Sequence, residues 1–444
     1  MFSSGLFRRV LLFVIFAVIA TSCVSGVRAG ARCRSTDWGD DGTYVLRCEK
    51  GRWVRKATKV QVAQLIVALL RARTTTTTTP TTGATTTTTT TTTVRQVRHT
   101  IAAGQTHSCA LVTVGVKCWG LNTSAQIGTG SQGGTVVSPV AVVGIAQADE
   151  VAAGGNFSCA RIVGQIKCWG RSSEGQLGNG SLNSFSLVPV VVTGITDASA
   201  IAAGDSHACA IVGTGSVKCW GSGSQGHLGN GASTDSSLPV SVLGITDARQ
   251  IDAKWTHTCV LTASGVVRCW GSNVKGQLGD GGTTNASSPV TANIAGASVI
   301  AVGSEESCAI VTGGQVKCWG WNSAGQLGNG AAVDSATPVS VMGLSGATAV
   351  AVGVAFACAV VTNGAVKCWG SNADLTLGTN GTSSSSVPAD NLAAPSAEAA
   401  ASTFSHGCVR LVAGGVQCWG KNSFSQIGDG TTMNRLAPVN VTGV

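Results

Sequence analysis

The sequence is poor in the side chains from which catalytic sites are built. Its 444 residues include one tyrosine and six histidines, and only 11% are charged. It contains no Gly-x-Ser-x-Gly elbow, no phosphate-binding Gly-Lys-Ser/Thr loop and no His-Glu-x-x-His motif. We therefore expect no catalysis, no cofactor and no metal. Catalytic pairs that meet only in the fold are invisible in a sequence, so a glycan- or peptide-active enzyme is kept as an alternative.

The apolar runs are too short to cross a membrane, which takes about 20 residues. The run at residues 10–20 follows two arginines (residues 8–9) and precedes small residues. This order is typical of a secretory signal peptide, which we place at residues 1–29 with cleavage after Ser22 or Ala29. The sequence therefore predicts an exported protein, extracellular or associated with the cell surface.

The positive charge does not extend over the body of the chain. Of the 29 lysines and arginines, 15 lie in residues 1–100 with only four acidic residues, whereas residues 101–444 have 14 against 16 acidic residues. Nucleic-acid binding needs Lys and Arg clustered on the folded unit. We therefore expect no nucleic-acid partner.

Seventeen cysteines in an exported chain predict disulfides rather than thiol chemistry. Cys23 either leaves with the signal peptide or becomes a lipidated N-terminus. We expect a membrane contact only if Cys23 is lipidated. The other sixteen cysteines are an even set, as a complete disulfide framework requires.

Residues 30–73 are predicted to form a small basic module. Cys33 and Cys48 favour a hairpin that is closed by one disulfide, and the apolar residues 60–70 fit a strand or a helix. Residues 74–93 are almost all threonine. Such a tract has no side chains with which to build a core, so it predicts a disordered, solvated linker.

From residue 94 to residue 444 the chain repeats seven times. Pairs of cysteines recur every 49 to 51 residues, and Trp-Gly follows each second cysteine. The first cysteines are Cys109, Cys159, Cys209, Cys259, Cys308, Cys358 and Cys408, and the second are Cys118, Cys168, Cys219, Cys269, Cys318, Cys368 and Cys418. A glycine-rich turn such as GQLGNG and a Pro-Val stretch such as PVSVLG complete a repeat.

Each repeat offers four short apolar stretches bounded by Gly, Pro, Asn and Ser, which predict strands and exclude amphipathic helices. Four-stranded units at this period indicate a β-propeller, whose ring removes the exposed sheet edges of a linear array. The fold class is therefore all-β, a seven-bladed β-propeller of four-stranded blades over residues 94–444. The sixth repeat loses the Pro-Val-x-Val-x-Gly ending near residues 387–402, which puts its fourth strand in doubt.

The cysteine spacing matches a hairpin. If the two cysteines face each other on neighbouring strands, five of the hairpin loops have three residues. The third is always glycine, as a left-handed position favours: Gly215, Gly265, Gly314, Gly364 and Gly414. Opposite residues lie within disulfide reach. We predict one disulfide in each blade rather than a metal site, because Cys-x8-Cys lacks the short spacing of zinc knuckles.

Two other positions recur. The tryptophans after the second cysteines occur in every repeat, so we predict that they pack between blades. Histidine stands two positions before the first cysteine in four repeats, at His107, His207, His257 and His406, where the others have Phe157, Glu306 and Phe356. A ring with two phenylalanines would not hold a metal, so we expect each histidine to bond to nearby backbone.

The phrases IAAGQTHSCAL, VKCWGLN, GQLGNG and SPVAVVGI resemble the regulator of chromosome condensation repeat, here in an exported, bacterial-type form with disulfides. The resemblance implies a seven-bladed propeller that pairing between the terminal repeats closes. Members of the family include a nucleotide exchange factor for the small GTPase Ran. An exchange-factor-like GTPase regulator is therefore another alternative, although these repeats lack that factor's inserted wedge and their cysteines argue against a nuclear role.

The residues just before the first cysteine and just after Trp-Gly are predicted to emerge on one face of the propeller. They vary between repeats, whereas the framework positions barely change. Aromatic residues with charges beside them are typical of binding hot spots. We predict a monomeric scaffold that binds a protein or a cell-surface glycan through Trp255, Trp321, Glu305, Glu306, Phe404, Lys421 and Arg171.

Overall fold

The computed structural model describes two units, which cover residues 1–91 and 92–444. The residues described are 24–25, 38–40, 44–49, 52–58, 100–393, 396–402 and 405–444. The predictions for the signal peptide, the Cys33–Cys48 bridge, the apolar residues 60–70 and the threonine-rich linker fall outside these ranges, apart from two residues of the signal peptide and Cys48 itself. Each unit is treated by itself.

The first unit contains a small sheet. Its strands are β1 (Val24–Ser25), β2 (Trp38–Asp40), β3 (Tyr44–Glu49) and β4 (Arg52–Thr58). Strands β2, β3 and β4 pair antiparallel in sequence order, and β1 runs parallel to β2. The antiparallel pair β2 and β3 lies in the segment where the hairpin was predicted, and β4 is a further strand after Cys48.

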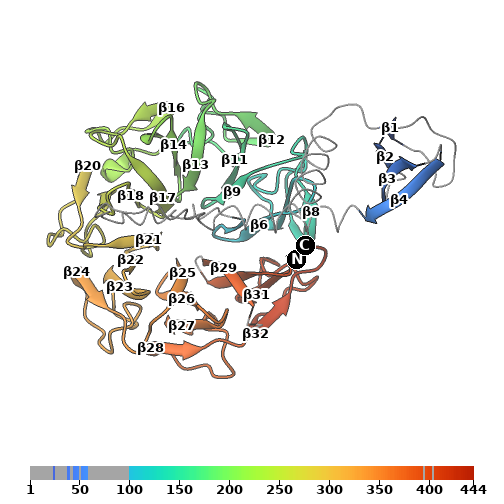
Figure 1. Ribbon diagram of the computed structural model, residues 1–444. Coiled ribbons are helices and arrows are strands. Elements are labelled where there is room, and N and C mark those ends of the chain that lie inside the picture. Colours follow the sequence, from blue (N-terminus) through green and yellow to red (C-terminus); the bar gives the residue numbers. More distant parts are fainter. Residues whose placement is uncertain are drawn as a thin grey trace, which may run out of the picture. The chain divides into compact units, whose positions relative to one another are not determined.

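The second unit is a propeller of seven sheets, each of four strands in sequence order (Figure 1). Blade 1 consists of β5 (Ile101–Ala103), β6 (His107–Leu111), β7 (Val116–Leu121) and β8 (Thr135–Ala141). Blade 2 consists of β9 (Glu150–Ala153), β10 (Phe157–Ile162), β11 (Gln165–Arg171) and β12 (Phe185–Val191). Blade 3 consists of β13 (Ala198–Ala203), β14 (His207–Val212), β15 (Ser216–Gly221) and β16 (Ser236–Ser241), with a short 3₁₀ helix at Ser224–Gly226.

Blade 4 consists of β17 (Ala248–Lys254), β18 (His257–Thr262), β19 (Val267–Gly271) and β20 (Ala286–Thr291). Blade 5 consists of β21 (Ala297–Val302), β22 (Glu306–Val311), β23 (Gln315–Gly320) and β24 (Ser335–Ser340). Blade 6 consists of β25 (Ala347–Val352), β26 (Phe356–Val361), β27 (Val366–Gly370) and β28 (Ser385–Asp390), so the fourth strand that the sequence left in doubt does form. Blade 7 consists of β29 (Ala397–Ser402), β30 (His406–Leu411), β31 (Val416–Gly420) and β32 (Arg435–Asn440).

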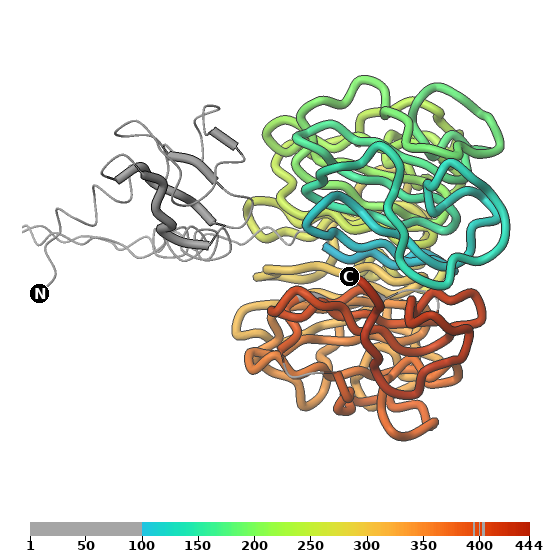
Figure 2. The backbone as a smooth tube through the Cα atoms, turned by 90° about the vertical axis from the view of Figure 1, so that its right-hand side faces the viewer, coloured from blue at the N-terminus to red at the C-terminus, as the bar shows by residue number. Residues whose placement is uncertain are grey.

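The ring closes by contact between blades 7 and 1, which lie side by side in both views (Figures 1 and 2). The innermost strands touch in order around the axis, and β29 returns to β5. The prediction of strand pairing between terminal repeats is wrong, because every sheet comes from one repeat. Instead Arg410 Nη1 donates to the Leu111 carbonyl at 3.0 Å, and Lys117 Nζ donates to the Gly443 carbonyl at 2.8 Å. These side-chain contacts can close the ring without a shared strand, because each blade already contains all four of its strands.

The predicted disulfide in each blade is confirmed. In every blade the two cysteines are directly opposite each other on the second and third strands, for example Cys109 and Cys118 on β6 and β7. The seven bridges have Cα–Cα distances of 4.0 to 4.1 Å, and all fourteen cysteines are buried. The predicted glycines of the five longer hairpin loops all have positive φ. The turn and the disulfide therefore demand the same register.

The repeated tryptophans are wedges between blades, as predicted. All seven are buried at 0–1% exposure, and each indole donates to a main-chain carbonyl of the preceding blade. The Nε1 atoms of Trp119, Trp169, Trp220, Trp270, Trp319, Trp369 and Trp419 donate to the carbonyls of Gln426, Gln126, Gln176, His227, Gln277, Gln326 and Thr376, respectively, at 2.7 to 3.0 Å. Each wedge thus joins two blades by packing and by one hydrogen bond.

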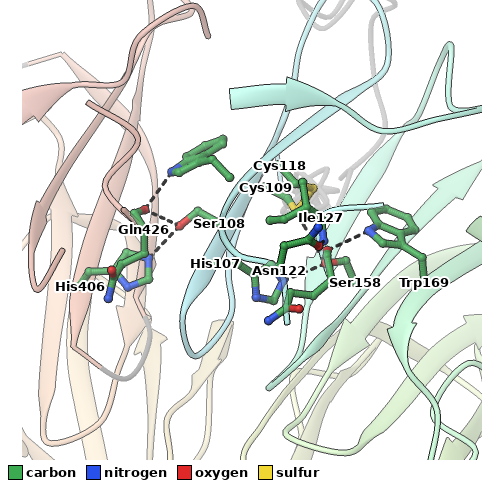
Figure 3. Close-up of a disulfide and its surroundings, with 12 residues drawn as sticks. His107, Ser108, Cys109, Cys118, Asn122, Ile127, Ser158, Trp169, His406 and Gln426 are labelled. Carbon is green, nitrogen blue, oxygen red and sulfur yellow. Dashed lines mark hydrogen bonds between the residues drawn. A yellow bond between two sulfur atoms is a disulfide. The ribbon is translucent and has the colours of Figure 1, made fainter. Parts of the chain in front are cut away.

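The histidines also join blades, and the Nε2 atom of each contacts a side-chain hydroxyl of a neighbouring blade rather than the backbone that was predicted. His107 Nε2 lies 2.8 Å from the Ser158 hydroxyl of the next blade (Figure 3). The same contact links His207 to Thr258, His257 to Ser307 and His406 to Ser108. The Ser158 hydroxyl donates to the Gln126 carbonyl at 3.0 Å. It must therefore accept a hydrogen from Nε2, which fixes the neutral His107 tautomer.

The sequence contains a signal for this contact. The four repeats with histidine are each followed by a repeat with Ser or Thr directly before its first cysteine. After Phe157, Glu306 and Phe356 that position is held by Ala208, Ala357 and Gly407. A buried imidazole N–H needs a hydrogen-bond acceptor, whereas a phenyl ring has no N–H group and needs none. The two positions therefore vary together around the ring.

We predict that this coupling is measurable at the junction of blades 4 and 5. Ser307→Ala removes the acceptor of His257 and should lower the free energy of unfolding by about 1–3 kcal/mol. The double variant His257→Phe/Ser307→Ala recreates the Phe157–Ala208 pair and should recover part of that loss. Guanidinium unfolding of the two single variants and the double variant gives the coupling energy. Additive effects would show that the contact has no energetic role.

Candidate functional site

The loops after the first strand and after the third strand of each blade lie together on one face, which we call the loop face. In every blade the residue after Trp-Gly donates its main-chain N–H to a carbonyl of the first-to-second-strand loop. The donors Leu121, Arg171, Ser222, Ser272, Trp321, Ser371 and Lys421 reach the carbonyls of Thr106, Asn156, Ser206, Thr256, Glu305, Ala355 and Ser405 at 2.7 to 3.0 Å. The two variable loop sets are therefore one surface, as the sequence predicted.

Asp205 holds the loops near the axis together. Its side chain accepts a hydrogen bond from Gln105 Nε2 at 2.8 Å, which connects blades 3 and 1. Its main-chain N–H donates to the Trp255 carbonyl at 3.0 Å, and its carbonyl accepts from Gly155 at 3.1 Å. Burial raises the pKa of Asp205 above its usual value. Sequence reasoning did not select Asp205 as a site residue, because its role depends on loops that lie 50 and 100 residues away.

Trp255 is partly buried and occupies a turn that is absent from blades 1, 2, 3, 5 and 6. In five blades a glycine directly follows the first strand and donates its main-chain N–H to the carbonyl three residues on, as Gly104 does to His107. Blade 4 has Lys254 at that position, and β17 runs on to pair Lys254 with His257. Trp255 then takes a left-handed φ of 48°, which is uncommon for a bulky side chain. This loop differs in sequence from its six counterparts and in backbone from the five that the structure describes in full.

Lys254 belongs to the same turn and was missed by sequence reasoning. It is partly buried, and burial lowers its pKa below the usual value. The neighbouring Asp252 accepts a hydrogen bond from Val302 N–H of blade 5 at 2.8 Å. Lysine in place of the glycine of five other repeats was the signal that could have pointed to it. Ionisable groups with shifted pKa values tend to gather at functional sites.

Trp321 and Glu305 lie opposite each other on blade 5, as predicted, because Trp321 N–H donates to the Glu305 carbonyl at 2.8 Å. Both side chains are partly buried. Glu306 does not lie on the exposed surface, since its side chain is fully buried. It takes the place of the interblade histidines, and its carboxyl accepts a hydrogen bond from Glu305 N–H at 3.0 Å. Burial raises its pKa to about 8, so it is a neutral acid at pH 7.

The remaining predicted residues lie farther along the loop face. Arg171 pairs with Glu174 at 2.7 Å within blade 2, and Lys421 of blade 7 lies 3.8 Å from Asp374 of blade 6. Both basic side chains are about two-fifths exposed. Phe404 lies outside the described residues. The structure thus places Trp255, Trp321, Glu305, Arg171 and Lys421 on one face, distributed over four blades.

The loop face offers a binding surface of mixed chemistry. Two tryptophans, paired charges and half-buried carboxylates can contact a partner through stacking, hydrogen bonds and ion pairs. Among residues 100–393, 396–402 and 405–444 no three His, Cys, Asp or Glu side chains are arranged to hold a metal ion. Within the described part of the chain no helix is long and apolar enough to cross a membrane.

Comparison with known proteins agrees with this architecture. Residues 164–211, 214–261 and 313–360 match the regulator of chromosome condensation (RCC1) repeat, and a second description of the same repeat matches residues 198–226, 248–277, 298–326 and 347–374. A search of curated protein sequences found no significant match. The chain is a seven-bladed repeat propeller. RCC1 repeats are present in it over residues 164–277 and 298–374.

Solved structures with the same fold come from yeast and human. Yeast RCC1 (Prp20) bound to Kap60 has 19% identity and a TM-score of 0.67, over 74% of this chain and 84% of that one. Prp20p from Saccharomyces cerevisiae, described with its binding to Gsp1p and histones, has 19% identity and a TM-score of 0.65, over 74% and 86%. Human WBSCR16 has 21% identity and a TM-score of 0.66, over 74% and 94%. At these identities the likeness shows the fold alone.

Proposed function

We propose that this propeller is a non-catalytic, monomeric binding scaffold that works outside the cytoplasm and uses its loop face to hold a protein or a cell-surface glycan. One observation carries the proposal: seven buried disulfides and seven tryptophan wedges repeat almost unchanged, whereas the residues of the loop face differ from blade to blade. A uniform framework with a variable surface is what a scaffold for recognition needs.

The disulfides support a location in an oxidising compartment. Such bridges persist in secreted and extracellular proteins and are rare in the cytosol. The N-terminal arginines and the short apolar run agree with export through a signal peptide. An exchange factor for a cytosolic GTPase would not meet its partner there. The yeast structures nevertheless support a protein as partner, because yeast RCC1 (Prp20) is bound to Kap60 in one of them.

The location is tested on protein purified from the culture medium of cells that express the full chain. Peptide mapping without reduction should give seven bridges within the repeats and a processed N-terminus. Free thiols in the propeller, or a chain that stays in the cytosol, would contradict export and reopen the GTPase-regulator alternative.

Binding is tested with arrays of glycans and of secreted or cell-surface ectodomains. The double variant Trp255→Ala/Trp321→Ala should bind any captured ligand at least tenfold more weakly than the wild type. The matched control is Val163→Ala/Val412→Ala, on exposed hairpin turns at the other end of the blades, which should bind normally. Equal binding by both double variants would remove the loop face from consideration, and turnover of glycan or peptide substrates would contradict a non-catalytic role.

A further inference from the structure

Six asparagines stand in the sequence Asn-x-Ser/Thr, which is the acceptor motif for N-linked oligosaccharides in secreted proteins. They are Asn122, Asn156, Asn179, Asn285, Asn380 and Asn440. The motif alone does not choose among them, because the same residues also serve turns and hydrogen bonds. Their surroundings in the folded propeller separate them.

Three of the six are exposed: Asn285, Asn380 and Asn440. Asn285 uses its Oδ1 atom to accept the Asn273 N–H at 2.8 Å, and Asn440 uses its Oδ1 atom to accept Gln417 Nε2 at 3.1 Å. An N-glycan is attached to Nδ2 and leaves Oδ1 in place. Both structural hydrogen bonds are therefore compatible with a glycan on the same side chain.

Asn122 is the opposite case. It is buried at 1% exposure, its Oδ1 accepts the Ile127 N–H at 3.1 Å, and its Nδ2 donates to the Ser131 carbonyl at 3.0 Å. A glycan on Nδ2 would require a bulky polar group inside the blade, so a chain modified there would not complete its fold. Asn156 and Asn179 are partly buried and are left outside the proposal.

The exposed acceptors share a place in the fold. Asn285 directly precedes β20, Asn440 ends β32, and Asn380 lies between β27 and β28. These outer strands lie at the periphery of the propeller (Figure 1), where each blade has an unpaired edge. Unpaired edges invite association with other strands. The chain has a proline in each outer strand, which limits such association, and a hydrophilic glycan would add to that protection.

We propose that Asn285, Asn380 and Asn440 are N-glycosylated, so that oligosaccharides shield the outer strands of blades 4, 6 and 7. In this reaction the Asn Nδ2 displaces a lipid pyrophosphate from the anomeric carbon of a lipid-linked oligosaccharide. The N–C bond forms, the C–O bond to the pyrophosphate breaks, and one amide proton is released. The inference rests on the proposed export, because the oligosaccharide donor and its transferase are met only in the secretory pathway.

The test expresses the full chain with its own N-terminus in insect cells, and in parallel with residues 1–29 replaced by a standard secretory leader. Folded protein from the medium is treated with peptide-N-glycosidase in heavy-oxygen water, which marks each formerly glycosylated asparagine as labelled aspartate. Label at all three exposed sites and none at Asn122 is the expected result. Secreted, disulfide-bonded protein without label at the three sites overturns the inference and leaves export standing. Retention with the native N-terminus but secretion with the leader contradicts export, and the leader form still decides the glycosylation.

The chain itself supplies a matched control for Asn285. In blades 3 and 5 the same acceptor position is held by Asp235 and Asp334, whose Oδ1 atoms accept the corresponding N–H groups at 2.9 and 2.8 Å. Asn285→Asp should therefore remove one glycan and keep the fold, and Ser287→Ala should remove the same glycan and keep the asparagine. Unchanged glycan mass in both variants would overturn the assignment of Asn285.

Discussion

Lowering the pH from 7 to 5 is expected to reduce the free energy of unfolding by several kcal/mol. Burial lowers the pKa of His107, His257 and His406 to about 3 and of His227 to about 4, and it also lowers the pKa of His207. In the unfolded chain these groups titrate near 6.5. Below that pH the unfolded state binds protons that the folded state does not bind. Each buried histidine therefore lowers the free energy of unfolding by on the order of 1 kcal/mol for each pH unit below 6.5.

The structure explains why the buried histidines remain neutral in the folded protein. The Nε2 atom of His107 already donates to a hydroxyl group, and within the described residues its Nδ1 atom has no hydrogen-bond partner. A proton on Nδ1 would create a buried charge whose new N–H has no acceptor. Guanidinium unfolding followed by tryptophan fluorescence at pH 5, 6 and 7 measures the effect. A stability that is flat over this range would show that the interblade histidines titrate normally.

Glu306 makes the opposite contribution to the pH dependence of the free energy of unfolding, and it therefore serves as an internal control. Its pKa is about 8 in the folded protein and near 4.3 when unfolded. The folded state keeps a proton that the unfolded state loses, so this contribution to stability is present below about pH 4 and is lost as the pH rises through 8. Glu306→Gln should abolish the decline between pH 6.5 and 8 and make the loss of stability from pH 6.5 to pH 5 steeper, because the proton that Glu306 takes up on folding opposes that loss. A decline that persists in the variant would exclude Glu306 as its cause.

Trp319→Ala is expected to lower the free energy of unfolding by about 3–5 kcal/mol, as for other large buried aromatics. Trp319 is fully buried between blades 4 and 5. Its removal leaves a cavity and takes one hydrogen-bond donor from the Gln277 carbonyl. Chemical unfolding with intact disulfides measures the loss.

Trp321→Ala, two residues along the same chain segment, is the matched control. Trp321 is only partly buried on the loop face, so its truncation should cost less than about 1 kcal/mol. The two variants have the same change in composition and differ only in position. Similar losses would mean either that the wedge contributes little or that Trp321 is part of the framework.

Much of the fold could be predicted because its units are short. The disulfide, the hairpin turn and its glycine lie within about ten residues, so that the register of two strands sets all three together. The number of blades follows from counting repeats, and the interblade role of the tryptophans follows from their presence in every one. The sixth repeat forms its fourth strand, β28, although it lacks the usual Pro-Val-x-Val-x-Gly ending. Pairing with β27 stabilises this strand, and such pairing cannot be recognised from the local sequence.

The candidate site was predicted less completely. The sequence placed Trp321 opposite Glu305 correctly, because both belong to one hairpin. It placed Glu306 on the surface, although the side chain of the adjacent residue on a strand points to the other side. The turn of Lys254 and Trp255 and the bridge from Asp205 to Gln105 depend on how loops from different blades meet near the axis.

By itself the sequence determined what each blade is: four strands, one disulfide, one wedge and a variable pair of loops. Only the tertiary structure decided what each blade touches. His406 contacts Ser108, which is 298 residues away in the sequence. Blades 7 and 1 are joined by side-chain hydrogen bonds such as Arg410 to Leu111 rather than by a shared strand. The physical reason is that hairpin geometry is set by local backbone register, whereas contacts between blades depend on the packing of complete sheets around a closed ring.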